Sequence, residues 1–359
     1  MITRFGTLFA GHVDLDNMGW AGTPVNDRWL SDEHLTTVFD KSVAMAQLMD
    51  RVGFETLWFA EHHFSNYGYM PNPLLFAVKI AQQTPRIRVG TGVLVMPFWN
   101  PVRIAEDIAM TDQLTDGRLE IGVARGYQPY EYSRFGLHKD DARDQTDESL
   151  TVMLKALTER AFTHDGPAHQ IPETTIYPRP LQQPRPPIWL ASSSRESFDL
   201  GVRHGLKAIT TTSTRPIEAI KTSWQHYLDA REAAGVEGPT DFSVQQNVVV
   251  APTDAEAREQ MVHVLYNNRQ AQALRSDTQR VEDGVSAELP YEGEPTLDEL
   301  FEERTFSGSP ETVIRKLRAY TDICDITRLN CVFRLGSMSP ETVAQSIRLF
   351  AKEVMPHFK

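Results

Sequence analysis

The chain has 359 residues, of which 41% are hydrophobic, so it can bury a substantial core. Its formal net charge of −12 argues against general affinity for nucleic acid or anionic membranes, since both bind basic surfaces. The two cysteines, Cys324 and Cys331, are too few for the disulfide framework of a secreted protein. No apolar run of about 18 residues and no cleavable N-terminal signal occurs. We therefore expect a soluble, cytoplasmic protein.

Short apolar runs alternate with longer segments of helical spacing along the chain. The runs are rich in β-branched and aromatic residues, as strands are. They lie at 4–10, 56–62, 87–96, 119–126, 187–192, 207–212, 242–251 and 328–335. Eight strand-and-helix units favour a (β/α)8 barrel over an open doubly wound sheet, which more often has fewer strands. The sequence thus predicts an α/β protein with a single barrel domain over 1–359.

Helix boundaries are marked between these runs. The segment 31–53 repeats apolar residues at helical spacing and ends at a glycine. The segment 100–117 has proline in its first turn and glycine at its end, and 339–356 begins with serine, proline and glutamate. These three segments are predicted helices.

The chain is longer than the usual ~250 residues of this barrel, so insertions are expected. Residues 160–186 are dense in proline and polar residues, which predicts a loop before the fifth strand. Residues 266–306, between the seventh and eighth strands, are acidic with little apolar periodicity. We interpret this second insertion as a mobile lid, and a solvated excursion is the alternative.

Unusual residues fall at the carboxyl ends of four consecutive strands, where the active site of this barrel is built. They are Glu61, His62 and His63 after the second strand, Gly92 and Val93 within the third, Ala124 and Arg125 after the fourth, and Ser193, Ser194 and Ser197 after the fifth. We expect them to converge on one mouth. Hydroxyls and free N–H groups at a helix start bind phosphate, so a cofactor with a phosphate tail would fit.

Each feature also has a simpler structural interpretation. Ser194 is a good N-cap and Ser197 a solvated first-turn residue, while Arg125 can pair with Glu120 or Asp116. The two histidines can be a bonded core histidine and a surface histidine. A zinc site needs a third close ligand that we cannot place, so no metal site is predicted. The shared location at strand ends favours the functional interpretation.

Seven motifs extend over nearly the whole chain. They are EHHF (61–64), VGTGVLVMP (89–97), NPVRIAEDIAMTDQLTDGRLEIGVARG (100–126), RFG (134–136), ASSSRES (191–197), FSGSPETVIRKL (306–317) and PETVAQSIRLFAKEVMPHFK (340–359). As a set they resemble the bacterial luciferase family of flavin-dependent monooxygenases, closest to the alpha subunit. The resemblance implies a barrel that reacts reduced FMN, supplied by a separate NAD(P)H:flavin reductase, with O2. A flavin C4a-peroxide would then oxidise a small, largely apolar organic substrate.

The resemblance also implies roles for single residues. His62 matches the catalytic imidazole, which suits proton transfer because its ordinary pKa is ~6.5, and Glu61 matches a neighbour that fixes the site. Arg125 matches the arginine beside the flavin. Arg143 matches a phosphate-binding arginine, whose planar fork can hold two oxygens.

Ser194 and Ser197 match the hydroxyls that complete the phosphate seat, and the bond between Gly92 and Val93 falls where the family has a cis peptide under the flavin ring. Ala124 stands where some light-emitting members carry a reactive cysteine. We therefore expect a monooxygenase without useful light output.

Two other functions stay open at this point. The same barrel can use the deazaflavin F420 to move hydride, although the EHHF motif favours FMN. Alternatively, the chain is a non-catalytic partner subunit, against which the retention of His62, Arg125 and Arg143 speaks. Related barrels pair through their second and third helices, so apolar 71–83 and 101–114 predict a homodimer.

Overall fold

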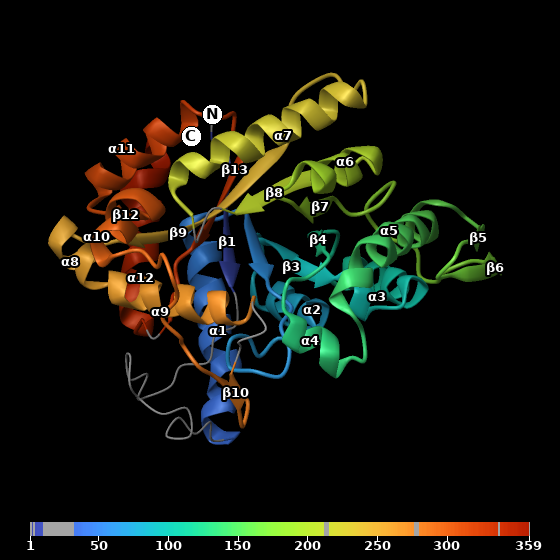
Figure 1. The fold of residues 1–359 in the computed structure, drawn as a ribbon, viewed down its shortest axis with the longest axis horizontal. Helices are drawn as coiled ribbons and strands as arrows, with labels where there is room; N and C mark the ends of the chain where they lie inside the picture. Colours follow the sequence, from blue (N-terminus) through green and yellow to red (C-terminus); the bar gives the residue numbers. More distant parts are fainter. Residues whose placement is uncertain are drawn as a thin grey trace.

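The computed structural model describes residues 2, 4–9, 32–211, 215–275, 280–336 and 338–358. Eight parallel strands close into a barrel with helices around it (Figure 1). The strands are β1 (Arg4–Phe9), β2 (Thr56–Phe59), β3 (Arg88–Val95), β4 (Leu119–Ala124), β7 (Ile188–Ala191), β8 (Lys207–Thr211), β9 (Phe242–Val250) and β13 (Arg328–Val332). The ring closes because β13 pairs with both β9 and β1. Each predicted run contains one of these strands, and the predicted (β/α)8 barrel is confirmed.

Helices connect consecutive strands, and most of them lie on the outside of the barrel. They are α1 (Asp32–Val52), α2 (Pro73–Gln83), α3 (Pro101–Leu114), α4 (Pro129–Arg134), α5 (Ala142–Thr158), α6 (Arg195–Arg203), α7 (Ile220–Ala233), α8 (Asp254–Glu259), α9 (Met261–Ala273), α10 (Leu297–Glu299), α11 (Pro310–Thr321) and α12 (Pro340–Leu349). Local capping explains several starts: the Asn100 side chain accepts the N–H groups of Val102 and Arg103 at the start of α3. The three predicted helices are confirmed as α1, α3 and α12. Among the described residues, no helix is both long and apolar enough to cross a membrane.

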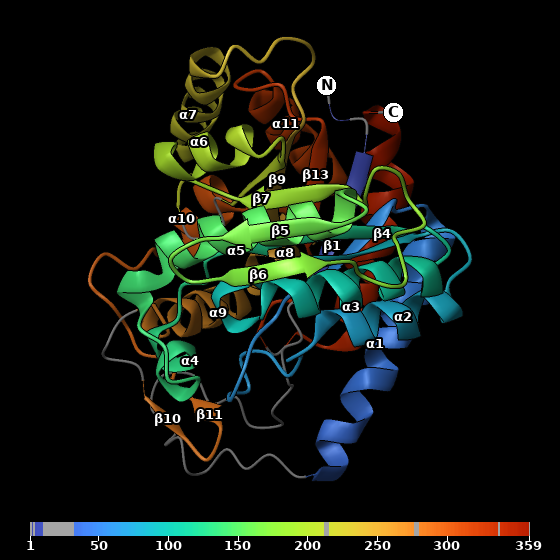
Figure 2. The same cartoon turned by 90° about the vertical axis from the view of Figure 1, so that its right-hand side faces the viewer.

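The insertion before the fifth barrel strand contains a β-hairpin, where we predicted only a loop. Strands β5 (Phe162–Asp165) and β6 (Gln170–Thr174) pair antiparallel with each other and lie beside α5 (Figure 2). Glu148 of α5 holds the hairpin by accepting the N–H of His169 at 2.7 Å. The prediction was wrong for these strands because they are mostly exposed, so they carry no apolar alternation.

The insertion between the seventh and eighth barrel strands is also confirmed, and it is largely folded. After α8 and α9 it contains a two-stranded hairpin, β10 (Val281–Glu282) and β11 (Val285–Ser286), then α10 and a π-helical turn over Leu300–Arg304. The short strand β12 (Phe306–Gly308) then pairs with β9 before α11 begins. Residues 276–279 of this insertion lie outside the described part of the chain.

A buried ionic network fills the amino-terminal part of the barrel interior. Both carboxylate oxygens of Glu120 in β4 accept hydrogen bonds from the guanidinium of Arg328 in β13, at 2.8 and 3.2 Å. Arg88 donates to the same carboxylate at 2.9 Å, and the Trp189 indole N–H at 2.8 Å. The network joins β3, β4, β7 and β13, so it ties opposite sides of the barrel together.

Candidate active site

The carboxyl ends of the barrel strands leave a recess along the barrel axis. Glu120 and Trp189 bond to each other inside the barrel, so the alternation of strand residues places Ala124 and Ala191 inside as well. Inward positions at this end are only partly buried, whereas most other strand residues are fully buried. These positions are Gly92, Val93, Ala124, Ala191, Thr211 and Gln245. Three of them are glycine or alanine, so small side chains surround the recess.

Two glycines shape the wall of this recess on β3 and after β4. The peptide bond between Gly92 and Val93 is cis, as the family resemblance implied. A Cβ atom at Gly92 would lie 2.8 Å from a methyl group of Leu8 and 3.0 Å from Cβ of Trp58, so a side chain there would crowd both residues. Gly126 has a φ of +80°, and a Cβ there would meet Val95 at 2.7 Å.

His62 follows β2 and lies among polar groups that come from the segment after β4. Its Nδ1 is 3.2 Å from Oε1 of Glu131 and 3.0 Å from Nε2 of Gln128. The rings of Tyr67 and Tyr127 contact the imidazole edge-on, with centroids 4.8 and 5.9 Å away. Within the described part of the chain, no hydrogen bond involves its Nε2 atom. That nitrogen is therefore available to a bound molecule.

The two polar neighbours of Nδ1 require different positions of the imidazole proton. Nδ1 can accept the Gln128 amide N–H only when Nδ1 is unprotonated. It can bond to the Glu131 carboxylate only when it carries a proton. In a neutral ring, Nε2 therefore carries the proton when Nδ1 accepts from Gln128, and Nε2 is unprotonated when Nδ1 donates to Glu131. His62 can consequently hold or take up a proton at Nε2, which is the requirement for a general acid or base.

Glu61 is only 2% exposed, and its carboxyl group connects the ends of two strands. One of its oxygens accepts the backbone N–H of Val95 at 2.8 Å, and the indole N–H of Trp99 lies 3.0 Å from the same oxygen. The other oxygen lies 3.0 Å from Nε2 of His63. Burial raises the pKa of Glu61, and these hydrogen bonds oppose the rise. The carboxyl thus ties the end of β2 to the end of β3.

Arg125 lies at the mouth with a half-buried side chain. Its carbonyl oxygen accepts the hydroxyl of Tyr132, which fixes the turn after β4. The alternative pairing of Arg125 with Glu120 is wrong, because Glu120 bonds to Arg88 and Arg328 inside the barrel.

The predicted phosphate seat lies at the start of α6. Ser194 is the N-cap and accepts the N–H of Ser197 at 3.4 Å, so its capping interpretation is confirmed. Ser193 is exposed beside it. The pKa of the exposed Glu196 is lowered by its own backbone N–H, by Ser194 and by the charge of Arg143. Arg143, at the start of α5, is therefore close enough to act electrostatically at this helix start.

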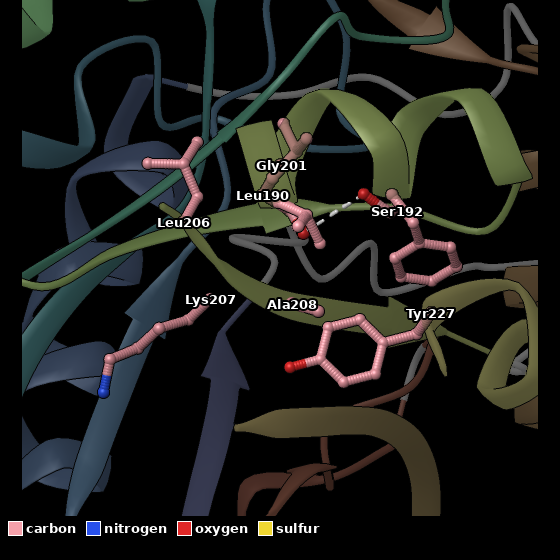
Figure 3. A pocket seen from close by; sticks show the side chains of 9 residues that line it. Leu190, Ser192, Gly201, Leu206, Lys207, Ala208 and Tyr227 are labelled. Carbon is pink, nitrogen blue, oxygen red and sulfur yellow. Dashed lines mark hydrogen bonds between the residues drawn. The ribbon is translucent and has the colours of Figure 1, made fainter. Parts of the chain in front are cut away.

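The predicted residues around His62 and those at the start of α6 form two separate groups. Within the described ranges, Arg143 acts on the start of α6 through its charge, and no hydrogen bond joins Arg143 or Ser194 to His62. Behind the seat, the space between β7, β8 and α6 leaves no room for a ligand (Figure 3). Its lining includes Leu190, Phe198 and Tyr227. It is part of the core that supports the seat.

Sequence reasoning placed Tyr127 at the strand ends but missed Glu131, Gln128 and Tyr67 around His62. Glu131 and Gln128 were not singled out, since nothing in their local pattern distinguishes them from ordinary surface residues. Tyr67 and Tyr127 join through their hydroxyls at 3.1 Å, and burial raises the pKa of both phenols. Both tyrosines contact His62 across the mouth of the barrel, and no pattern in the neighbouring sequence predicts these contacts.

Residues 17–325 match the family model of the luciferase-like monooxygenases. The chain belongs to this family. It is 31% identical over 329 residues to the oxygenase component of a flavin-dependent trigonelline monooxygenase from Acinetobacter baylyi, covering 89% of this chain and 90% of that protein. It is 23% identical over 339 residues to an alkanal monooxygenase alpha chain from a Kryptophanaron alfredi symbiont, covering 90% and 93% of the two chains.

The fold of this luciferase-like monooxygenase is also similar to a solved structure. The oxygenating constituent of 3,6-diketocamphane monooxygenase from Pseudomonas putida, in complex with FMN, superposes with a TM-score of 0.78. The sequences are 22% identical, and the alignment covers 99% of each chain. At this identity the likeness concerns the fold.

Proposed function

We propose that this protein is the oxygenase component of a two-component system that uses reduced FMN and O2 to oxidise a small, largely apolar organic molecule. The observation that carries the proposal is the position of His62, whose Nε2 is uncommitted beside the recess. Two similar proteins support it: one is the oxygenase component of a flavin-dependent monooxygenase, and the other was solved with FMN.

The residues around the recess suit a flavin by their small side chains and their donors. The small side chains of Gly92, Ala124 and Ala191 leave space for a planar ring at the strand ends. Arg125 would lie beside the ring, and Arg143 with the serines at the start of α6 would hold the phosphate. When bound in reduced form, FMN would activate O2 and supply one oxygen atom to the substrate.

The chain's own residues would position the reactants and hold or transfer protons. His62 would hold or take up a proton at Nε2, and Glu131 would orient its ring through Nδ1. Glu61 would act as a positioning residue, because its carboxyl joins the ends of β2 and β3. The aromatic rings of Tyr67 and Tyr127 would exclude water from one side of the imidazole.

The experiment that tests this function supplies the purified protein with a flavin reductase, NADH, FMN and isotopically labelled O2. A panel of small aldehydes, ketones and aromatic compounds is offered, and the products are analysed by mass spectrometry. We expect one labelled oxygen atom in each product molecule. Consumption of NADH that yields only hydrogen peroxide across the whole panel would contradict the proposal.

Arg143→Ala is expected to weaken FMN binding by about tenfold or more, because a charge-assisted contact with the phosphate is lost. Binding of riboflavin, which lacks the phosphate, should be unchanged. Both affinities are measured by quenching of flavin fluorescence, and F420 is titrated in parallel. An equal loss for FMN and riboflavin would place Arg143 away from the phosphate.

The control for Arg143→Ala is a variant whose FMN affinity is expected to increase. Glu196 is exposed and presents a negative charge beside Ser194. Glu196→Gln should therefore tighten FMN binding modestly while leaving riboflavin binding unchanged.

The lid role of residues 266–306 stays a prediction. The insertion packs on the loop after β2: Asn66 donates its backbone N–H to Gly284 at 2.7 Å and accepts that of Ser286 at 2.8 Å. This contact places the β10–β11 hairpin close to the segment that carries His62.

We further propose a homodimer formed through α2 and α3. These helices are linked by Gln82, which donates to the Leu114 carbonyl at 3.0 Å, and they expose Leu75, Met110 and Leu114 by 70%, 48% and 45%. Met110→Glu is expected to weaken dimerisation by about 100-fold, because it would bury an unpaired charge. Light scattering over a concentration series measures the mass. A control, Val236→Glu, changes an exposed residue after α7 and should leave the dimer intact.

A further inference from the structure

Asn268 on α9 carries a buried side-chain amide without a partner among the described residues. The residue is 1% exposed, and neither Oδ1 nor Nδ2 forms a hydrogen bond within that part of the chain. Buried polar groups in folded proteins nearly always have a partner, because an unmet hydrogen bond in the interior is unfavourable. The two atoms therefore indicate a partner outside the described residues, such as a bound molecule.

Helix α9 crosses the carboxyl end of the barrel. Near its start, the His263 carbonyl and the Tyr266 ring lie against Gly336, in the loop after β13. Near its end, Ala271 and Leu274 pack on Tyr67, after β2. In both views α9 lies on the same side of the barrel as α4 and the β10–β11 hairpin (Figure 1 and Figure 2). The middle of the helix thus spans the mouth.

Helical spacing puts Asn268 on the face that looks toward the site. It lies four residues after Val264, which belongs to the main core, and three before Ala271. One further turn along the same face, the Arg275 guanidinium lies 4.7 Å from the ring centroid of Tyr127. The residues on either side of Asn268 on this face therefore contact the barrel core and the tyrosines beside His62.

A second unpaired amide atom belongs to Gln128, beside the pair of Tyr67 and Tyr127. Gln128 is 1% exposed, and its Oε1 has no hydrogen-bond partner in the described part of the chain, although its Nε2 bonds to His62 and Tyr127. Unpaired polar atoms thus occur on two elements that meet the same pair of tyrosines. This arrangement points to a bound molecule with polar groups of its own.

We propose that Asn268 recognises a planar carboxamide, lactam or imide edge of a molecule bound at the mouth. A primary amide donates through Nδ2 and accepts through Oδ1, so it pairs with a group that has a carbonyl and an N–H side by side. The inference rests on the proposed function, which places ligands at this mouth. Such an edge can belong to the organic substrate or to the flavin, whose pyrimidine ring carries one.

Benzamide and acetophenone are suitable probes, because they are similar in size and only benzamide has an N–H beside its carbonyl. Each is titrated into the full-length protein by ligand-observed NMR, and FMN is titrated by fluorescence quenching. The variants are Asn268→Leu, Asn268→Ala and the control Gln272→Leu, which changes an exposed amide on the same helix. Thermal unfolding of each variant shows that it is folded.

If the substrate supplies the edge, benzamide binds the wild type at least tenfold more tightly than acetophenone, and both Asn268 variants abolish this preference. If the flavin supplies it, the same variants weaken FMN binding at least tenfold. Gln272→Leu should change neither affinity. Unchanged benzamide preference and unchanged FMN affinity in folded Asn268 variants would overturn the inference. A wild type that shows the preference yet transfers no oxygen would overturn the proposed function alone.

Discussion

Replacing His62 by alanine is expected to slow product formation from the reduced-flavin complex by about 10²–10⁴-fold, the usual contribution of a general acid or base. The variant loses the nitrogen whose proton Glu131 and Gln128 control through Nδ1. The rate is measured in a single turnover by mixing enzyme, reduced FMN and substrate with O2. Because the phosphate seat at the start of α6 is unchanged, the affinity for FMN should stay within about threefold.

The matched control for this change is His138→Ala, which removes an exposed histidine after α4. It should leave the rate of product formation unaltered. A His62→Ala enzyme that kept more than half of the wild-type rate would remove His62 from the chemistry. Loss of FMN binding in that variant would instead give the imidazole a role in holding the cofactor.

Glu120→Gln is expected to lower the free energy of unfolding by about 3–5 kcal/mol, because it leaves the buried Arg328 without its carboxylate. Urea denaturation followed by tryptophan fluorescence measures the loss. The control is Glu55→Gln, since Glu55 lies 3.7 Å from Arg328 but is about one-third exposed. Its loss should be at most about 1 kcal/mol. Equal losses for the two variants would contradict a dominant role of the buried pair.

The same network predicts a pH dependence of stability. Burial alone would raise the pKa of Glu120, but the charges and hydrogen bonds of Arg328 and then Arg88 outweigh it and lower the pKa. The unfolded chain therefore takes up a proton first, near its ordinary pKa of about 4.3, as the pH falls. The stabilisation by Glu120 is complete above that pH and is lost as the pH falls through the lowered folded-state pKa. The difference between wild type and Glu120→Gln should shrink over that acidic range.

Much of the fold was predictable because its signals are local. Each barrel strand is a short run of buried residues, as in 119–126, and each predicted helix has its own cap or stop residue. The β5–β6 hairpin was not predicted, because its strands pair only with each other and stay largely exposed. Strand-end chemistry was predictable in part, since the position of His62 after β2 follows from the order of the elements.

The sequence by itself determined the barrel and the residues at its strand ends, because apolar periodicity and turn residues act between neighbours in the chain. Only the tertiary structure decided that Glu131, 69 positions away, contacts His62, that Glu61 is buried between two strands, and that the Asn268 amide has no partner among the described residues. Hydrogen-bond partners and burial depend on which distant segments meet when the barrel closes. Those encounters leave no trace in local spacing.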